Sequence, residues 1–144
     1  MSGEKLEVVV RKTYRHSAER VFDAWLDIGL ARAFLFATQG GEMIGAEVDP
    51  RVGGRFLFVD RRKEGDAAHY GVFKEIDRPR RLVFSFSVEM YDVNAAKVIV
   101  EIAPLATGCQ LTLTQEMPPE YAEYKERSEK GWAMILESLE RALA

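Results

Sequence analysis

The segment from Pro118 to Ala144 limits the fold of this chain more than any other, because it predicts a long helix with one apolar face. Proline is tolerated in the first turn of a helix, and Glu120 and Glu123 lie where the helix dipole favours negative charge. Spacings of three and four separate the residues of an apolar stripe, which are Tyr121, Tyr124, Ser128, Trp132, Ile135, Leu139 and Ala142, widened by Leu136 and Leu143. Such a helix is stable only against a broad apolar surface, which the middle of the chain must supply.

Gly131 is the irregular residue of this helix. A glycine inside a helix costs about 1 kcal/mol relative to alanine. Its position beside Trp132 therefore predicts either close packing of the backbone against a strand or open space next to the indole.

The rest of the chain changes from helical to strand periodicity after Gly41. The pattern predicts a first strand over Leu6–Tyr14 and two short helices, over Ala18–Leu26 with Ser17 as N-cap and over Leu30–Ala37. Six further strands are predicted, over Met43–Asp49, Arg55–Arg61, His69–Ile76, Leu82–Val88, Lys97–Ala103 and Cys109–Gln115. Short connections, among them a bend from Asp92 to Asn94, make this run an antiparallel meander, and its apolar face needs a cover. We therefore expect one α+β domain over residues 1–144, with about seven strands covered by the last helix.

Charge and cysteine content exclude several classes of protein. The formal net charge is -3, and acidic and basic residues are interspersed, so neither a nucleic-acid surface nor a membrane-binding basic face is indicated. The short basic cluster of Arg78, Arg80 and Arg81 is interpreted as a solvated turn. Cys109 is the only cysteine, which excludes an internal disulfide and a thiolate zinc cluster. No apolar run is long enough to insert into a membrane, and we expect a cytoplasmic protein.

Residues with catalytic or metal-binding chemistry are few. His16 and His69 are the only histidines, neither has a second ligand at metal-binding spacing, and both are predicted to be surface or turn residues. Cys109, at the start of a strand, is predicted to be a small apolar residue rather than a nucleophile. No catalytic residue, metal or organic cofactor is assigned.

Strand parity places two polar residues on the predicted apolar face. Asp60 shares a face with Phe56 and Phe58, and Gln115 shares one with Leu111 and Leu113. Each lies near the end of its strand, so it is either a rim residue that reaches solvent or a polar group inside the fold. Large aromatic residues should converge on the same face, as either a packed core or the wall of a ligand cavity, and the sequence does not distinguish the two.

Several short motifs together carry a family resemblance. They are Val21-Phe22-Asp23-Ala24-Trp25, Asp49 through Gly53-Gly54-Arg55-Phe56, Gly71 to Ile76 with Pro79 and Leu82-Val83-Phe84 after it, Gly108 before Leu111-Thr112-Leu113-Thr114, and Gly131-Trp132 with Leu136 and Leu139. In order and spacing the chain resembles the Hsp90 ATPase activator-homology (AHSA1-like) family of the START/Bet v 1-like (SRPBCC) superfamily.

The resemblance implies a helix-grip fold, in which a curved antiparallel sheet grips the C-terminal helix over an apolar cavity. The chain departs from relatives at Phe34, where tryptophan is common, and at Cys109, where threonine often stands. The eukaryotic co-chaperones of the family carry a further N-terminal domain for which this chain has no room. Hsp90 activation is therefore not expected.

Three functions are consistent with this interpretation. The first is binding of a small apolar or aromatic ligand with a polar end, for transport, sequestration or sensing. Its cavity would be lined by Trp25, Phe34, Phe56, Phe58, Phe84, Phe86, Trp132 and Leu136, with Asp60, Gln115, Tyr124 or Ser128 orienting the polar group. The second is an enzyme of cyclase or hydrolase type, for which a buried Asp60 or His69 would be the best candidate. The third is a protein-interaction or co-chaperone-like module, and a homodimer is left open.

Overall fold

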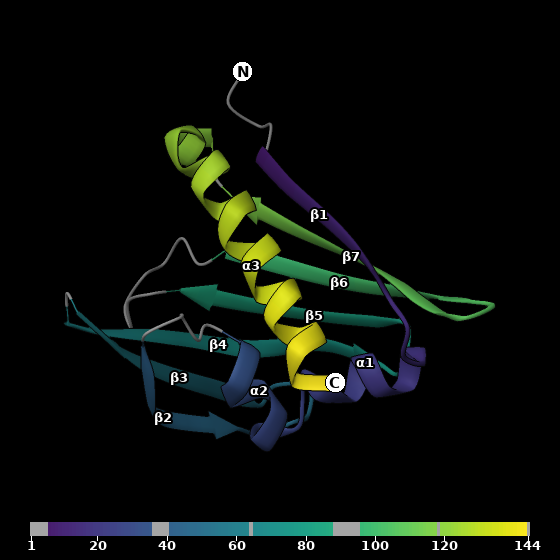
Figure 1. The fold of residues 1–144 in the computed structure, drawn as a ribbon. Helices are drawn as coiled ribbons and strands as arrows, with labels where there is room; N and C mark the ends of the chain where they lie inside the picture. Colours follow the sequence, from purple (N-terminus) through teal and green to yellow (C-terminus); the bar gives the residue numbers. More distant parts are fainter. Residues whose placement is uncertain (1–5, 36–40, 64, 88–95, 118, 144) are drawn as a thin grey trace.

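The computed structural model describes residues 6–35, 41–63, 65–87, 96–117 and 119–143. It contains a seven-stranded sheet in the order β1-β7-β6-β5-β4-β3-β2, with every pair antiparallel (Figure 1). The strands are β1 (Leu6–Tyr14), β2 (Glu42–Val48), β3 (Arg55–Arg62), β4 (Gly65–Asp77), β5 (Arg81–Ser87), β6 (Ala96–Leu105) and β7 (Gly108–Met117). The predicted strands and their meander are confirmed, whereas the bend from Asp92 to Asn94 lies outside the described residues.

The first strand pairs with the last one. β1 lies beside β7 in unbroken register from Leu6 opposite Met117 to Tyr14 opposite Cys109. The two short helices carry the chain across the sheet between β1 and β2, which therefore form its two edges. This long-range pairing brings the start of the chain next to the strand that leads into the last helix.

Two irregularities interrupt the ladders. The register shifts between Met43 and Gly45 in β2, and between Phe73 and Glu75 in β4. The second shift leaves Lys74 as an extra residue, which explains why charged residues from Tyr70 to Ile76 do not follow a simple alternation. Such bulges bend a strand and increase its twist.

Side-chain caps begin both short helices. Ser17 accepts a hydrogen bond from the backbone of Arg20 at the start of α1 (Ala18–Ala24). Asp27 accepts hydrogen bonds from the backbones of Gly29 and Leu30 at the start of α2 (Ile28–Phe34). The second helix begins two residues earlier than predicted because aspartate is a strong N-cap that the apolar spacing alone does not reveal.

The final helix departs from the prediction at its start. A 3-10 segment, η1 (Pro119–Tyr124), comes first, and the α-helix α3 begins at Lys125 and ends at Leu143. Tyr124 was predicted to lie in the buried stripe, and that placement is wrong, because its relative exposure is 42%. The buried residues of α3 are Trp132, Leu136, Leu139 and Leu143. A 3-10 turn advances fewer residues per revolution than an α-helix, so the helical spacing does not carry back through η1.

α3 runs diagonally across one face of the sheet, which we call the inner face (Figure 1). The helix packs against β1 and α2. Two long-range hydrogen bonds fix it, from Tyr14 Oη to the carbonyl oxygen of Leu136 at 2.7 Å and from Arg20 Nη2 to that of Leu143 at 2.6 Å. The second of these satisfies a carbonyl group that the C-terminal end of a helix leaves without a partner of its own.

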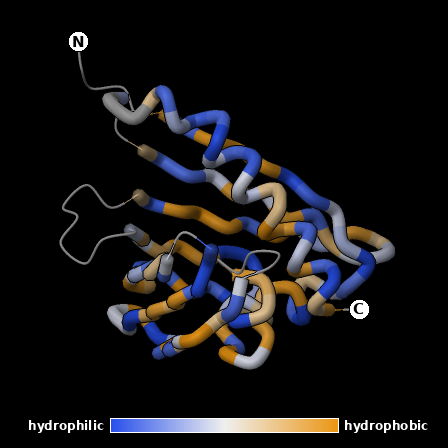
Figure 2. The backbone as a smooth tube through the Cα atoms, turned by 60° about the vertical axis from the view of Figure 1, so that its left-hand side comes forward, coloured by the Kyte–Doolittle hydropathy of each residue, from blue (hydrophilic) through white to orange (hydrophobic). Residues whose placement is uncertain are grey.

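Apolar residues alternate with polar ones along the strands, as Figure 2 shows in its hydropathy colours. On β6, for example, Val98, Val100 and Ile102 are buried while Lys97 and Glu101 are exposed. Buried residues of this kind on six of the strands form one core with the helices, and β2 adds the partly buried Met43, Ala46 and Val48. None of the helices in the described part of the chain is both long and apolar enough to span a membrane.

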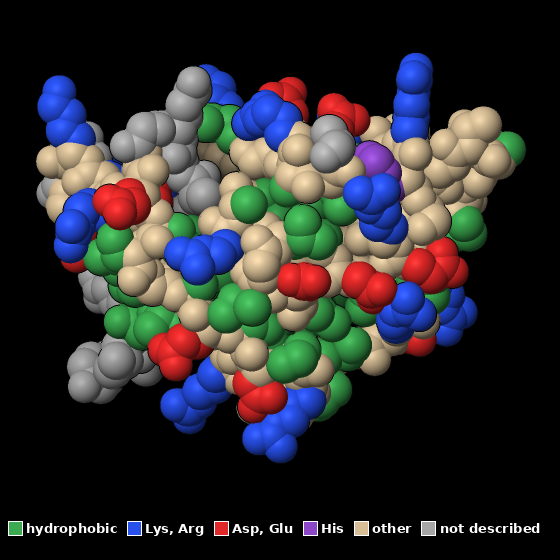
Figure 3. All heavy atoms as spheres, turned by 60° about the horizontal axis from the view of Figure 1, so that its bottom comes forward, with side chains coloured by type: hydrophobic (Ala, Val, Ile, Leu, Met, Phe, Trp, Pro, Cys, Tyr) green, Lys and Arg blue, Asp and Glu red, His purple; other side chains and the backbone are tan. Residues whose placement is uncertain are grey.

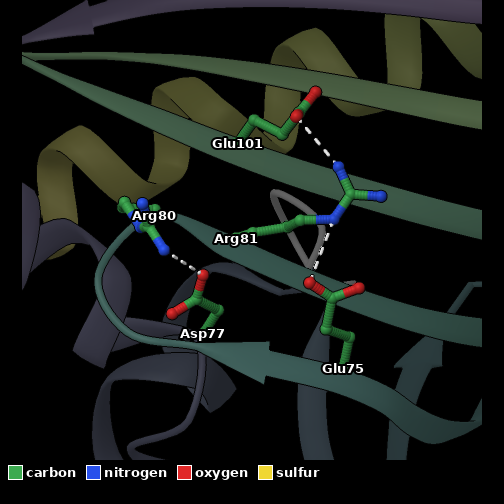
Figure 4. Close-up of polar contacts among 5 residues, drawn as sticks. All are labelled: Glu75, Asp77, Arg80, Arg81 and Glu101. Atoms are coloured by element: carbon green, nitrogen blue, oxygen red, sulfur yellow. Dashed lines mark hydrogen bonds and ion pairs between the residues drawn. The ribbon is translucent and has the colours of Figure 1, made fainter.

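The basic cluster at the turn between β4 and β5 is matched by acidic residues. Arg78 forms a two-pronged ion pair with Asp23 of α1 at 2.7 and 2.8 Å. Arg80 contacts Asp77, and Arg81 lies between Glu75 and Glu101 on the outer face (Figure 4). Figure 3 shows acidic and basic side chains interspersed over one side of the molecule. The cluster is therefore a charge-compensated turn.

Candidate functional site

The inner face of the sheet holds a continuous cluster of aromatic side chains beside α1 and α2. The Trp25 ring meets Phe34 edge-on at 5.2 Å between centroids, and lies 6.3 Å from Phe84. The Phe56 ring continues the cluster, at 5.4 Å from Phe84, 5.5 Å from Phe73 and 5.8 Å from Phe58. Five of the predicted lining residues thus contact one another, and all of them are buried.

Gly71 explains how the Phe56 ring can lie flat on the sheet. Gly71 stands directly opposite Phe56 on β4, and a Cβ atom there would overlap Phe56 Cζ, 2.0 Å away. Because Gly71 has no side chain, it leaves the space that the Phe56 ring occupies.

A second aromatic group lies beneath α3. The Trp132 ring meets Phe86 edge-on at 5.6 Å, and its Nε1 donates a hydrogen bond to Gln115 Oε1 at 2.5 Å. Phe86 comes from β5 and Gln115 from β7, so the indole spans the strand between them. Gln115 is buried, as one alternative from strand parity predicted, and its amide oxygen holds the orientation of Trp132.

Asp60 also lies inside the fold. Its relative exposure is 1%, and its Oδ2 accepts a hydrogen bond from Arg62 Nε at 2.9 Å. The side chain of Arg62 is 31% exposed, so this ion pair extends from the inner face to its rim.

His69 was predicted to be a surface or turn residue, and this prediction is wrong. It stands opposite Phe58 in the β3–β4 ladder, and its relative exposure is only 7%. Burial, assisted by the nearby charge of Arg62, lowers the pKa of His69 to about 4, against the weaker opposing effects of Asp60 and of the carbonyl groups of Phe58 and Ala67. The imidazole is therefore uncharged at neutral pH, where it carries one hydrogen-bond donor and one acceptor.

Trp25 brings a further polar atom into the aromatic cluster. Its relative exposure is 1%, and its Nε1 has no hydrogen-bond partner within the described residues. An indole N–H in an apolar environment ordinarily has an acceptor. This group is therefore available to an acceptor on a ligand or a water molecule.

The remaining predicted site residues come from η1 and α3. Ser128 is half-buried on α3, and Tyr124 is exposed on η1. Leu136 is buried, and its carbonyl oxygen receives the Tyr14 hydrogen bond. The predicted ligand contacts omitted Phe73, and His69 was named only for the enzyme alternative. The positions of both depend on the strand register around β4.

Cys109 is buried, and burial raises the pKa of its thiol, so the prediction of a small apolar residue is consistent with its surroundings. No group of three or more His, Cys, Asp or Glu residues within the described ranges is arranged to hold a metal ion.

Two pockets open on the surface of the described part of the chain. One of about 540 Å³ adjoins the β2–β3 turn and includes Phe56, while the other, of about 430 Å³, adjoins Arg15 and Leu105. Apart from Phe56, neither pocket contains a predicted ligand contact.

A curved antiparallel sheet with two short helices after its first strand and one long C-terminal helix across its inner face defines an α+β protein of the helix-grip, Bet v 1-like class. Residues 15–144 match the family described as Activator of Hsp90 ATPase homolog 1-like protein. The chain belongs to this family, which confirms the resemblance seen in the sequence.

Solved structures of similar fold support this classification. A Nitrosomonas europaea protein is 21% identical, with a TM-score of 0.83 over 96% of this chain and 94% of its own. The AHSA1-like protein of Aeromonas hydrophila is 23% identical, with a TM-score of 0.81 over 96% and 92% of the two chains. CalU16 of Micromonospora echinospora is 22% identical, with a TM-score of 0.74 over 99% and 79%. No curated protein matches the chain. At these identities the likeness establishes the fold.

Proposed function

We propose that this protein binds a small apolar or aromatic ligand between the inner face of the sheet and α3. The observation that carries the proposal is the burial of Asp60 and His69 on a face whose other buried side chains are mainly aromatic and aliphatic. In a purely structural core, burying a carboxyl group and an imidazole costs free energy because both groups are removed from water. A binding site gains from them, since a few polar groups among apolar walls orient a ligand.

The inner face offers separate contacts for the apolar body and for the polar end of such a ligand. The cluster around Phe56 offers ring faces and edges for an apolar body. Asp60 and His69 lie at the end of the β3–β4 hairpin, where they would contact the polar end. Trp132, held by Gln115, would form the wall on the side of α3.

The burial of His69 also favours the second candidate function, an enzyme that uses the same cavity. A pKa of about 4 makes His69 a weak base, however, and general-base catalysis is most efficient when the pKa lies near the operating pH. We therefore place ligand binding first and regard proton transfer by His69 as secondary.

A protein-interaction role receives less support from the surface. Large apolar side chains that are exposed come from different elements, such as Ile28 on α2, Leu105 at the β6–β7 turn and Met134 on α3. Recognition of protein partners ordinarily uses a contiguous apolar patch. The charge-compensated outer face around Arg81 provides no such patch.

Native mass spectrometry of the purified protein, followed by a thermal-shift screen of fatty acids, flavonoids and polyketide-like aromatics, tests the proposal. We expect a defined adduct or a concentration-dependent rise in melting temperature. Phe86→Ala, on the inner face, should weaken that response, while Leu105→Ala, at an exposed turn, should leave it unchanged. An empty protein that no compound stabilises would contradict ligand binding and favour a filled core.

A further inference from the structure

Asp60, His69 and Arg62 form a polar cluster at one end of the aromatic inner face. Phe58, directly opposite His69, is fully buried, and Asp60 follows two residues later on the same face of β3. Diagonal neighbours across an antiparallel pair lie within reach of each other's side chains. A ligand that packs against Phe58 would therefore meet both polar groups.

The charges in this cluster are arranged asymmetrically. Arg62 Nε lies 2.9 Å from Asp60 Oδ2, but the arginine side chain is 31% exposed and the aspartate side chain 1%. The negative charge is therefore inside and the positive charge at the rim. Among the described residues, the polar side chains buried on this face are Asp60, His69 and Gln115, together with the uncharged Tyr14 hydroxyl and the indole N–H groups of Trp25 and Trp132. His69 is uncharged because its pKa is lowered to about 4. None of these groups offers a buried positive charge to an anion.

This arrangement discriminates between polar groups on a ligand. A carboxylate would meet the like charge of Asp60 where water screens it poorly. An ammonium group would lose its hydration and would have to compete with Arg62, which already pairs with the Asp60 carboxylate. A hydroxyl group carries no charge, can donate a hydrogen bond to Asp60, and can exchange one with the neutral imidazole of His69.

We propose that the inner-face site selects apolar ligands whose polar end is an uncharged hydroxyl group, and that Asp60 excludes the corresponding carboxylates. This inference rests on the proposed ligand-binding function and specifies the class of ligand. It makes Asp60 the residue that determines specificity, with His69 as a neutral hydrogen-bonding partner.

Four naphthalene probes test the selection, because they share one apolar body and differ in the attached group. Titration calorimetry at pH 7 compares 2-naphthol, 2-naphthoate, 2-naphthylmethylammonium and unsubstituted naphthalene. We expect 2-naphthol to bind at least about tenfold more tightly than 2-naphthoate, and more tightly than the ammonium probe. Equal or tighter binding of 2-naphthoate or the ammonium probe would overturn this inference and leave ligand binding intact. Failure of all four probes to bind would also overturn this inference, while the proposed function is decided separately by the thermal-shift screen.

The variant Asp60→Asn tests whether Asp60 causes the preference for 2-naphthol over 2-naphthoate. Removal of the negative charge should strengthen 2-naphthoate binding and reduce the preference for 2-naphthol to less than about threefold. Asp66→Asn is the matched control, because Asp66 lies on the same hairpin but is exposed and pairs with Arg61. This control should keep the wild-type preference. An unchanged preference in Asp60→Asn would contradict the role of Asp60. The ratio of the 2-naphthol and 2-naphthoate affinities in the wild type tests the preference itself without any variant.

Discussion

Tyr14 Oη donates a buried hydrogen bond of 2.7 Å to the carbonyl oxygen of Leu136, 122 residues further along the chain. The bond joins the end of the first strand to the middle of the last helix. Burial, with smaller contributions from Glu140 and Cys109, raises the pKa of Tyr14, so its hydroxyl remains a donor at neutral pH. The edge strand β1 thus holds α3 over the inner face by a specific polar contact as well as by apolar packing.

Removal of this hydrogen bond should destabilise the protein. We expect Tyr14→Phe to lower the free energy of unfolding by about 1 to 2 kcal/mol, because the phenyl ring keeps the packing while the donor is lost. Urea denaturation at pH 7 measures the change. Tyr70→Phe, on the outer face, serves as the control and should change stability by less than about 0.5 kcal/mol. Equal effects of the two substitutions would contradict the assigned role of Tyr14.

Two glycines should respond oppositely to the same substitution. Gly131 is exposed on α3, and a Cβ there meets nothing within 4 Å in the described structure, so Gly131→Ala should stabilise the protein by about 0.5 to 1 kcal/mol. A Cβ at Gly71 would overlap the Phe56 ring and lie 2.4 Å from the Ser85 carbonyl oxygen, so Gly71→Ala should cost about 1 to 3 kcal/mol or more. Urea midpoints of the two variants test the contrast, which a change of the same sign in both would refute.

The stability of the protein should depend on pH through His69. Its pKa falls from 6.5 in the unfolded chain to about 4 in the fold, so the unfolded state binds more protons between these values. This pKa difference contributes about 3 kcal/mol to the free energy of unfolding. The contribution is complete above pH 6.5 and is lost as the pH falls towards 4. Arg62 strengthens this dependence and Asp60 weakens it.

His69→Gln should remove that part of the acid sensitivity. We expect the variant to lose less stability than the wild type between pH 6.5 and 4.5, as measured by urea denaturation at each pH. His16→Gln, at the other histidine, should retain the wild-type slope. Parallel pH profiles for wild type and His69→Gln would show that His69 is not held neutral by burial.

The contact between Trp132 and Gln115 should be energetically coupled. Gln115→Leu leaves the buried indole N–H without its acceptor and should cost about 1 to 3 kcal/mol. In Trp132→Phe that donor is absent, so adding Gln115→Leu should cost less than it does in the wild type. A double-mutant cycle measures the difference, which we expect to be about 1 kcal/mol. Additive effects would exclude a stabilising hydrogen bond at this position.

Truncation of Trp132 tests its place in the site. Trp132→Ala should destabilise by about 3 to 5 kcal/mol if the indole is fully packed, and by less if it borders an open cavity. Unfolding experiments with and without a bound ligand separate the two cases. A full-size loss together with unchanged ligand uptake would refute the proposal that Trp132 faces the ligand.

Strand parity succeeded where the strand is regular. Counting in twos from Phe56 and Phe58 placed Asp60 on the apolar face, and no register shift interrupts the pairing of β3 with β4 before that residue. Counting from Leu111 and Leu113 likewise placed Gln115 on the apolar face of the regular strand β7, and the structure decided that both residues are buried. It failed for His69, which lies in a strand of mixed polarity whose apolar face is recognised only through its pairing with Phe58.

The sequence by itself determined the local elements, because alternation and helical spacing record which side of each element avoids water. It determined the antiparallel meander, the amphipathic final helix and the inward faces of the regular strands. Tertiary structure decided the pairing of β1 with β7, the space that Gly71 leaves for Phe56, and the burial of His69. Those features depend on contacts between residues distant in the sequence, and no local periodicity encodes which distant atoms share the same space.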